Sequence, residues 1–147
     1  MSLVLGLNAK LYRNTGTYAS PTWALIGNVK NVTLNLEKGE ADVTTRSNNG
    51  WRANVGTLKD ASIEFQMVWD TDDTHFSAIK DAFLANTPIE FLVLDGPVAT
   101  AGSQGLRATC DIMSFSRDEQ LEEALMVNVT AKPTYSVNAP EWFEVPA

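Results

Sequence analysis

The sequence contains little cysteine and little histidine. Its 147 residues include one cysteine, Cys110, and one histidine, His75. A single thiol cannot form an intrachain disulfide or a multi-cysteine zinc site, so stability must come from packing. The same composition fits a reducing compartment.

Basic charge is also scarce. Eleven Lys and Arg residues stand against eighteen Asp and Glu residues, and the net charge is −7. The basic residues are scattered and form no cluster of three or more. Proteins that bind DNA tightly neutralise its phosphates with a basic patch, so we do not expect tight DNA binding. An acidic surface repels DNA instead.

Long hydrophobic runs are absent. No run of about 18 apolar residues exists, so we predict no contact with a membrane. Met1 to Leu7 is apolar but too short for the core of a secretion signal, and Asn8 and Lys10 interrupt it. Hydrophobic residues still make up 44% of the chain, enough for a sizeable core. We therefore predict one domain over residues 1–147.

Alternation of apolar and polar residues predicts most of the secondary structure. The clearest strand runs from Ala61 to Trp69. Further strands are predicted at 6–13, 23–26, 29–38, 51–55, 89–95, 106–112 and 125–131, with a charged connection at 115–122. Residues 133–147 are predicted as a C-terminal tail broken by prolines, with Trp142, Phe143 and Val145 as candidate anchors.

One helix is predicted after the strand that ends at Trp69. Asp70 to Asp73 supply capping residues and negative charge at its start. Phe76, Ile79 and Phe83 follow at helical spacing, and Asn86-Thr87-Pro88 ends the pattern. Seven to nine strands with one helix predict a mainly β fold, either a β-sandwich or a partial barrel with a flanking helix.

A long polar loop is predicted for residues 39–58. It contains Asn49-Gly50, a step that favours a tight turn. A loop of this length in a small domain is functional or mobile. Trp51 and Arg52 follow the turn and suit a contact between proteins. Packing of Trp51 on the base of the hairpin explains this residue equally well.

The residue types needed for catalysis do not converge anywhere in the sequence. His75 lies among acids at the start of the helix, where an exposed surface residue is the simplest interpretation. Cys110 has apolar neighbours and is interpreted as a buried, inert thiol. Asp70, Asp72 and Asp73 lack the rest of a calcium loop. We therefore predict no enzyme, and no catalytic, cofactor-binding or metal-binding residues.

One stretch resembles a known family. The residues are Asp42-Val43-Thr44-Thr45, then Gly50-Trp51-Arg52, then Leu58-Lys59 before the alternating strand that starts at Ala61. This order is similar to that of the major tail proteins, or tail-tube proteins, of long-tailed phages. The family often has Pro-Gly-Leu before that strand, whereas this chain has Gly56-Thr57-Leu58.

The resemblance implies a structural subunit of a virion tail, assembled in the host cytoplasm. Subunits would close into six-membered rings that stack into a tube with other tail proteins, and DNA would pass through the lumen without specific binding. The loop would reach a neighbouring subunit or ring. The predicted interface residues are Asp42, Val43, Thr44, Thr45, Arg46, Gly50, Trp51, Arg52 and Leu58. The predicted lumen residues are Glu37, Glu40 and Glu64, because they lie on polar strand faces or just beyond.

Three other functions remain open from the sequence. A tube protein of a secretion or contractile injection system would follow the same physical rules. A monomeric β-sandwich binding module would stay monomeric and hold a ligand in a concave pocket. A hydrolase would need a pair of facing carboxylates, and no spacing singles out such a pair.

Overall fold

The computed structural model describes residues 6, 9–119, 121–122 and 124–146. Met1 to Leu5, parts of the strand predicted at 6–13 and parts of the connection predicted at 115–122 lie outside these residues. The elements are β1 (Lys10–Asn14), β2 (Trp23–Leu25), β3 (Val29–Asp42), the 3-10 helix η2 (Arg46–Asn48), β4 (Asn54–Val68), α1 (Thr74–Ala85), β5 (Ile89–Leu94), β6 (Gln104–Asp118), β7 (Met126–Pro133) and β8 (Glu141–Glu144).

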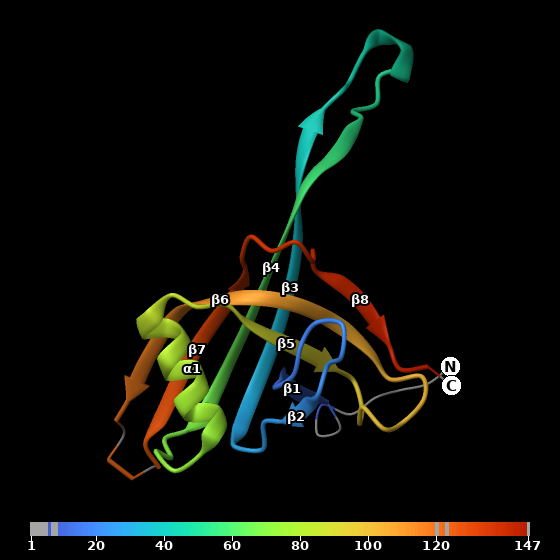
Figure 1. Ribbon diagram of the computed structural model, residues 1–147. Coiled ribbons are helices and arrows are strands. Elements are labelled where there is room, and N and C mark those ends of the chain that lie inside the picture. Colours follow the sequence, from blue (N-terminus) through green and yellow to red (C-terminus); the bar gives the residue numbers. More distant parts are fainter. Residues whose placement is uncertain (1–5, 7–8, 120, 123, 147) are drawn as a thin grey trace.

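The eight strands of the described residues belong to one antiparallel sheet in the order β2-β1-β5-β6-β7-β4-β3, and β8 pairs with β6. The sheet curls around a core, and α1 lies against it (Figure 1). The prediction of a mainly β fold with one helix is confirmed. Because the sheet is continuous from β2 to β3, the architecture is a partial barrel rather than two stacked sheets.

Strand β6 joins the two halves of the sheet. Its first half pairs with β5 and β8, and its second half, from Cys110 to Asp118, pairs with β7. The prediction of a charged connection from Phe115 onward is wrong for Phe115 to Asp118. A register shift between Ile112 and Ser114 is the reason. One extra residue moves the core-facing position from Ser114 to Phe115, so strict alternation stops early.

The main core lies between the concave face of the sheet and α1. Its largest fully buried side chains include Ile63, Met67, Phe76, Ile79 and Phe91. Asp73 caps the helix by accepting a hydrogen bond from the His75 backbone N–H (3.3 Å), and Asn86 ends it in the left-handed conformation.

Aromatic rings connect the helix to the sheet. Phe76 packs edge-on against Trp69 at 4.9 Å and lies 5.7 Å from Phe115, and Phe83 stacks on Phe115 at 6.3 Å. Phe65 and Phe76 belong to the main core, and Trp69 and Phe83 pack against it.

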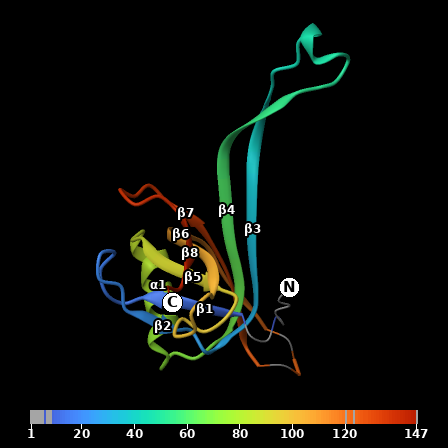
Figure 2. The same ribbon diagram turned by 90° about the vertical axis from the view of Figure 1, so that its right-hand side faces the viewer.

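A long two-stranded arm projects from the body (Figures 1 and 2). It is formed by the parts of β3 and β4 that have no other strand beside β4. The pairing of β4 with β7 covers Ile63 to Val68, so the arm comprises the residues of β4 before Ile63 and the residues of β3 opposite them. We call residues 35–62 the arm. The loop predicted for residues 39–58 is shorter in the structure, because β3 continues to Asp42 and β4 begins at Asn54. Hydrogen bonds between the two strands hold these polar residues in a ribbon. Because both faces of the ribbon are exposed, its residues need not alternate between apolar and polar.

The C-terminal tail returns to the body. Strand β8 pairs with β6 from Gln104 to Arg107. Phe143 packs edge-on against Trp23 at 6.1 Å, while Trp142 remains 59% exposed. Phe143 and Val145 therefore anchor the tail against the second, smaller core around Tyr12, Leu92 and Leu94.

Candidate assembly surfaces

The tip of the arm, residues 43–53, has a defined structure of its own. The Thr44 hydroxyl accepts a hydrogen bond from the Ala53 N–H (2.8 Å) and donates one to the Ala53 carbonyl (3.3 Å). Thr45 caps η2, and Asn49 and Gly50 both have positive φ, at 53° and 85°. The predicted Asn-Gly turn is therefore present, and it needs the left-handed conformations that these two residues tolerate.

An acidic turn starts the tip. Asp42 accepts a hydrogen bond from the Thr44 N–H at 2.9 Å. Hydrogen bonds from Thr44 lower the pKa of the Asp42 carboxyl below its ordinary value, because they stabilise the charged form. The Asp-Val-Thr-Thr sequence thus has a local structural role.

Large apolar side chains on the arm have no cover in their own chain. Trp51 is 77% exposed and Leu58 is 84% exposed, and Val43 and Val55 are about half exposed. The exposure of Trp51 contradicts the hypothesis that it packs on the base of the hairpin. Arg46, Gly50, Trp51 and Arg52 line one shallow concavity at the tip, together with Thr44 and Thr45. The structure thus brings these predicted interface residues to one place, and it puts Leu58 at a separate one.

Leu58 lies at a bulge halfway along the arm. Lys38 pairs with Lys59 and Glu40 pairs with Gly56, so Thr57 and Leu58 lie opposite Gly39 alone. A side chain at Gly39 would collide with the Thr57 hydroxyl, which explains the glycine. The bulge turns Leu58 outward.

The face of the sheet opposite the core is polar over β3, β4, β6 and β7. The ladder places Glu37 beside Asp60 and Glu64 beside Thr33 and Thr130 on this face. The other residues on it include Asn31, Asn35, Ser62, Gln66, Asn128, Ser114, Ser116 and the charged pair of Asp111 and Lys132. The three predicted lumen residues do not lie together: Glu37 and Glu64 share this polar face, whereas the register puts Glu40 on the opposite face, with Lys38.

The sheet ends at β2 and β3, and β6, in its middle, also has a stretch of open edge. The outer edge of β3 has no strand beside it along its length, and β6 has none on its β5 side beyond Cys110, within the described part of the chain. Unpaired edges present rows of N–H and C=O groups to a further strand.

A buried ion pair holds the region where β1, β5, β6 and β8 meet. Arg107 is 7% exposed and donates hydrogen bonds to Glu90 Oε1 from Nε (3.2 Å) and Nη2 (3.1 Å). Its guanidinium lies 3.8 Å over the Tyr18 ring, donates to the Tyr18 carbonyl and approaches Glu141 at 3.7 Å. Sequence reasoning missed this cluster. The available signal was a charged residue, Glu90 or Arg107, among the apolar residues of each of two strands.

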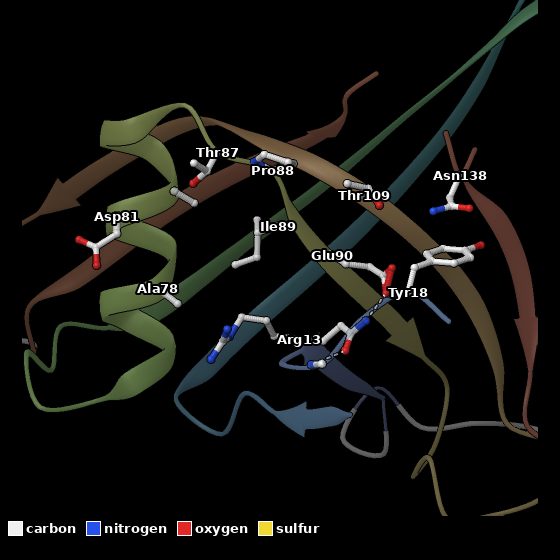
Figure 3. A pocket seen from close by; sticks show the side chains of 13 residues that line it. Arg13, Tyr18, Ala78, Asp81, Thr87, Pro88, Ile89, Glu90, Thr109 and Asn138 are labelled. Atoms are coloured by element: carbon white, nitrogen blue, oxygen red, sulfur yellow. Dashed lines mark hydrogen bonds between the residues drawn. The ribbon is translucent and has the colours of Figure 1, made fainter. Parts of the chain in front are cut away.

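A pocket of about 390 Å³ lies beside this cluster, between the end of α1, the β1–β2 loop and the C-terminal segment (Figure 3). Arg13, Asp81 and Glu90 are its charged residues. Glu90 also accepts a hydrogen bond from Asn14 Nδ2 at 2.8 Å. The Glu90 carboxylate is therefore held by both Arg107 and Asn14.

Neither His75 nor Cys110 has the surroundings of a reactive side chain. His75 Nδ1 accepts a hydrogen bond from Arg13 Nε at 3.1 Å, so the interpretation of His75 as an exposed residue is wrong. Burial and then the Arg13 charge lower its pKa. Cys110 is buried, and burial raises the pKa of its thiol to about 12, in agreement with an inert thiol.

Within the described residues, no group of three or more His, Cys, Asp or Glu side chains is placed to hold a metal ion. No helix of this part of the chain is long and apolar enough to cross a membrane.

The sequence model of the family described as "phage tail tube protein" matches residues 9–134, which cover most of the strands, the arm and the helix. The chain belongs to the phage tail tube protein family. As a tail tube protein, it is a structural component of a virion tail. Among curated proteins, none matches its sequence.

Solved structures share the fold of this tail tube protein. A chain from the tail of an empty gene transfer agent particle, refined with C6 symmetry, has a TM-score of 0.72 and 18% identity, over 95% of this chain and 98% of that one. A chain of the SPP1 tail tube has a TM-score of 0.71 and 16% identity, over 99% and 81%. A chain of the anti-feeding prophage baseplate has a TM-score of 0.61 and 6% identity, over 99% and 98%.

Proposed function

We propose that copies of this tail tube protein close into six-membered rings, that the rings stack into a tube with other tail proteins, and that DNA passes through the lumen. Assembly takes place in the host cytoplasm, and the protein has no enzymatic activity. Family membership supports the tail assignment. The C6 symmetry of the similar gene transfer agent tail supports six subunits.

The observation that carries this proposal is the pair of open strand edges on one sheet. The edge of β3 and the edge of β6 beyond Cys110 belong to different strands, so a contact between them is heterologous. A heterologous contact repeated by rotation closes into a ring. Edge-to-edge pairing also removes unpaired backbone groups from solvent.

The arm supplies the second contact. Its exposed tip joins an aromatic side chain, Trp51, to the cations Arg46 and Arg52, the residue types enriched at protein interfaces. Asp42, Val43, Thr44, Thr45 and Gly50 hold the tip in shape, and Leu58 offers an apolar contact on the side of the arm. The proposed partner is another copy of the chain.

The polar face of the sheet is the proposed lumen lining. Glu37, Asp60, Glu64 and Asp111 make it acidic, Lys132 lies opposite Asp111, and most of the remaining side chains are uncharged amides and hydroxyls. Carboxylates repel phosphate, and uncharged polar groups form no strong ion pairs with it, so DNA slides without specific binding. Glu40, on the opposite arm face, is left out of this lining.

The first test is light scattering after size exclusion over a concentration series, with negative-stain images of the largest species. The expected result is a ring of six times the 16.1 kDa mass of one chain, together with stacked rings at high concentration. A strict monomer at millimolar concentration, also in the presence of tail initiation proteins, would contradict the proposal and favour a monomeric binding module.

A further inference from the structure

Two successive cross-strand pairs in the arm place like charges opposite each other. Glu37 pairs with Asp60, and Lys38 pairs with Lys59. Because side chains alternate along a strand, the two carboxylates lie on the polar face of the ribbon and the two ammonium groups lie on the other face. Like charges directly opposite each other destabilise an antiparallel pair of strands. The ribbon is therefore weakened at two adjacent positions.

Other charged groups do not neutralise these two pairs. Within the described part of the chain, none of the four side chains forms an ion pair. Glu40 follows Lys38 on the same face, beyond the bulge. Glu141 lies near the two lysines, but its ion pair is with Arg107, at 3.7 Å. All four paired residues are exposed, so dissolved salt screens the repulsion between them.

The bulge of the arm follows these pairs directly on the side of the tip. Thr57 and Leu58 lie opposite Gly39, and Gly56 comes next on β4. A bulge interrupts the ladder of hydrogen bonds and increases the local twist, and glycine restricts the backbone less than any other residue. Figure 2 shows that the ribbon changes direction between the body and the tip. The repelling pairs and the bulge thus weaken one continuous segment.

The arm is held more firmly on both sides of this segment. Towards the body, Asn35 Nδ2 donates a hydrogen bond across the strands to Ser62 Oγ at 3.2 Å. Towards the tip, the Thr44 hydroxyl is bonded to both the N–H and the carbonyl of Ala53. The weak segment therefore separates two well-connected parts of the ribbon.

We infer that residues 37–40 and 56–60 form a hinge, at which the tip of the arm moves as one unit relative to the body. β4 pairs with β7 only from Ile63 onward, so the hydrogen bonds of the hinge can open without disturbing the core. A few residues that absorb a change in backbone angles are sufficient for such a motion. The use of the hinge, to let the tip reach a neighbouring copy, rests on the proposed tube function.

An exchange of two neighbouring residues tests the hinge. Lys59→Asp with Asp60→Lys turns both cross-strand pairs into pairs of opposite charge and keeps the net charge of −7. The further changes Glu37→Lys and Lys38→Glu restore like charges in both pairs, and this fourfold variant is the matched control. In unassembled chains, amide hydrogen exchange in the hinge should be about threefold to tenfold slower in the twofold variant than in the other two chains.

Salt gives a second readout on the same three chains. Higher salt screens repulsion in the wild type and in the fourfold variant, so exchange in the hinge should slow relative to exchange in the tip. The same salt screens attraction in the twofold variant, where exchange in the hinge should accelerate. Equal exchange rates in the three chains, or the same direction of salt dependence in all of them, would overturn the inference.

The motion itself is measured between the tip and the helix. Nitroxide labels at Ser47→Cys and Lys80→Cys report the distance by double electron–electron resonance, and both positions are exposed, whereas Cys110 is buried. The distance distribution should be broad in the wild type and in the fourfold variant and narrower in the twofold variant. Equal widths would contradict the hinge. Because these experiments use unassembled chains, a failure to form rings or tubes would count against the proposed function alone.

Discussion

At the residue scale, the buried ion pair of Arg107 and Glu90 connects several elements of the fold. Arg107 connects Glu90 on β5, the carbonyl of Tyr18 in the β1–β2 loop and Glu141 on β8. Its stacking on the Tyr18 ring adds an attraction that a lysine would not reproduce in the same planar form. The cluster attaches the N-terminal hairpin and the C-terminal strand to the body.

Loss of Arg107 should destabilise the fold strongly. Arg107→Gln leaves the Glu90 carboxylate buried without its partner, and we expect the free energy of unfolding to fall by about 3–5 kcal/mol. Urea denaturation measures this change. The exposed pair of Arg117 and Glu119 provides the control, since Arg117→Gln should cost about 1 kcal/mol or less. Equal losses in the two variants would contradict the structural role of the buried pair.

His75 should make stability depend on pH in a mildly acidic window. Its folded-state pKa is lowered from 6.5 by burial and by Arg13, so the unfolded chain takes up its proton at a higher pH than the folded chain. The stabilisation is therefore fully present above about pH 6.5 and decreases as pH falls toward the folded value. Thermal unfolding between pH 7.5 and 5.5 should show this decrease in the wild type and a smaller one in His75→Gln. A steeper decrease in the variant would contradict the assigned direction.

At the element scale, β3 and β4 have different surroundings in the body and in the arm. In the body, β4 pairs with β7 on one side and packs on the core with one face, and from Ala61 to Val68 buried residues alternate with half-buried or exposed ones. In the arm, the same two strands have only each other, and exposed residues follow one another from Leu36 to Ser47. An isolated two-stranded ribbon is at best marginally stable in water, so the arm is suited to gain stability from a neighbour.

Removal of the arm should therefore separate folding from assembly. Lys38 and Lys59 face each other, so residues 39–58 can be replaced by Asn-Gly as a two-residue hairpin turn. The free energy of unfolding should change by about 1 kcal/mol or less, and stacked tubes should disappear. Circular dichroism melts and negative-stain images measure the two effects. Leu84→Ser, at a 71% exposed apolar residue of α1, is the control and should leave both unchanged. Tubes of normal length from the shortened chain would contradict a role of the arm in stacking.

At the scale of the whole molecule, charge and shape are arranged along one direction. The arm leaves one end of the body, and the end of β6 and the start of β7 lie at the other (Figure 2). The polar face of the sheet extends along the strands between these two ends, from the arm toward the start of β7. A subunit with distinct ends, open side edges and one acidic face has the geometry that a stacked ring needs.

Reversal of the charges on the polar face should change how assembled tubes treat DNA. Tubes of Glu37→Lys with Glu64→Lys should retain short double-stranded DNA at low salt and release it as salt increases, whereas wild-type tubes should retain none. Co-sedimentation over a salt series measures retention. Asp81→Lys with Glu144→Lys changes the net charge equally outside this face and should behave like the wild type. Equal retention by the two variants would place the effect outside the lumen.

The sequence by itself determined the local elements whose patterns are periodic. Ala61 to Trp69, the helix with its Asp73 cap and the buried Cys110 strand follow from alternation, helical spacing and capping chemistry, which act between neighbours in the chain. The order Asp42-Val43-Thr44-Thr45 and Gly50-Trp51-Arg52 also indicated the family, because local turn geometry fixes those residue types.

Only the tertiary structure decided features that depend on partners far apart in the sequence. It extended β3 and β4 into an arm, because cross-strand pairing orders polar residues that have no periodic pattern. It carried β6 past a bulge to Asp118, since one inserted residue shifts the alternation. It also joined Arg107 to Glu90 and Tyr18 and separated Glu40 from Glu37 and Glu64. Register and long-range packing set these relations, and residue order alone carries no local signal of them.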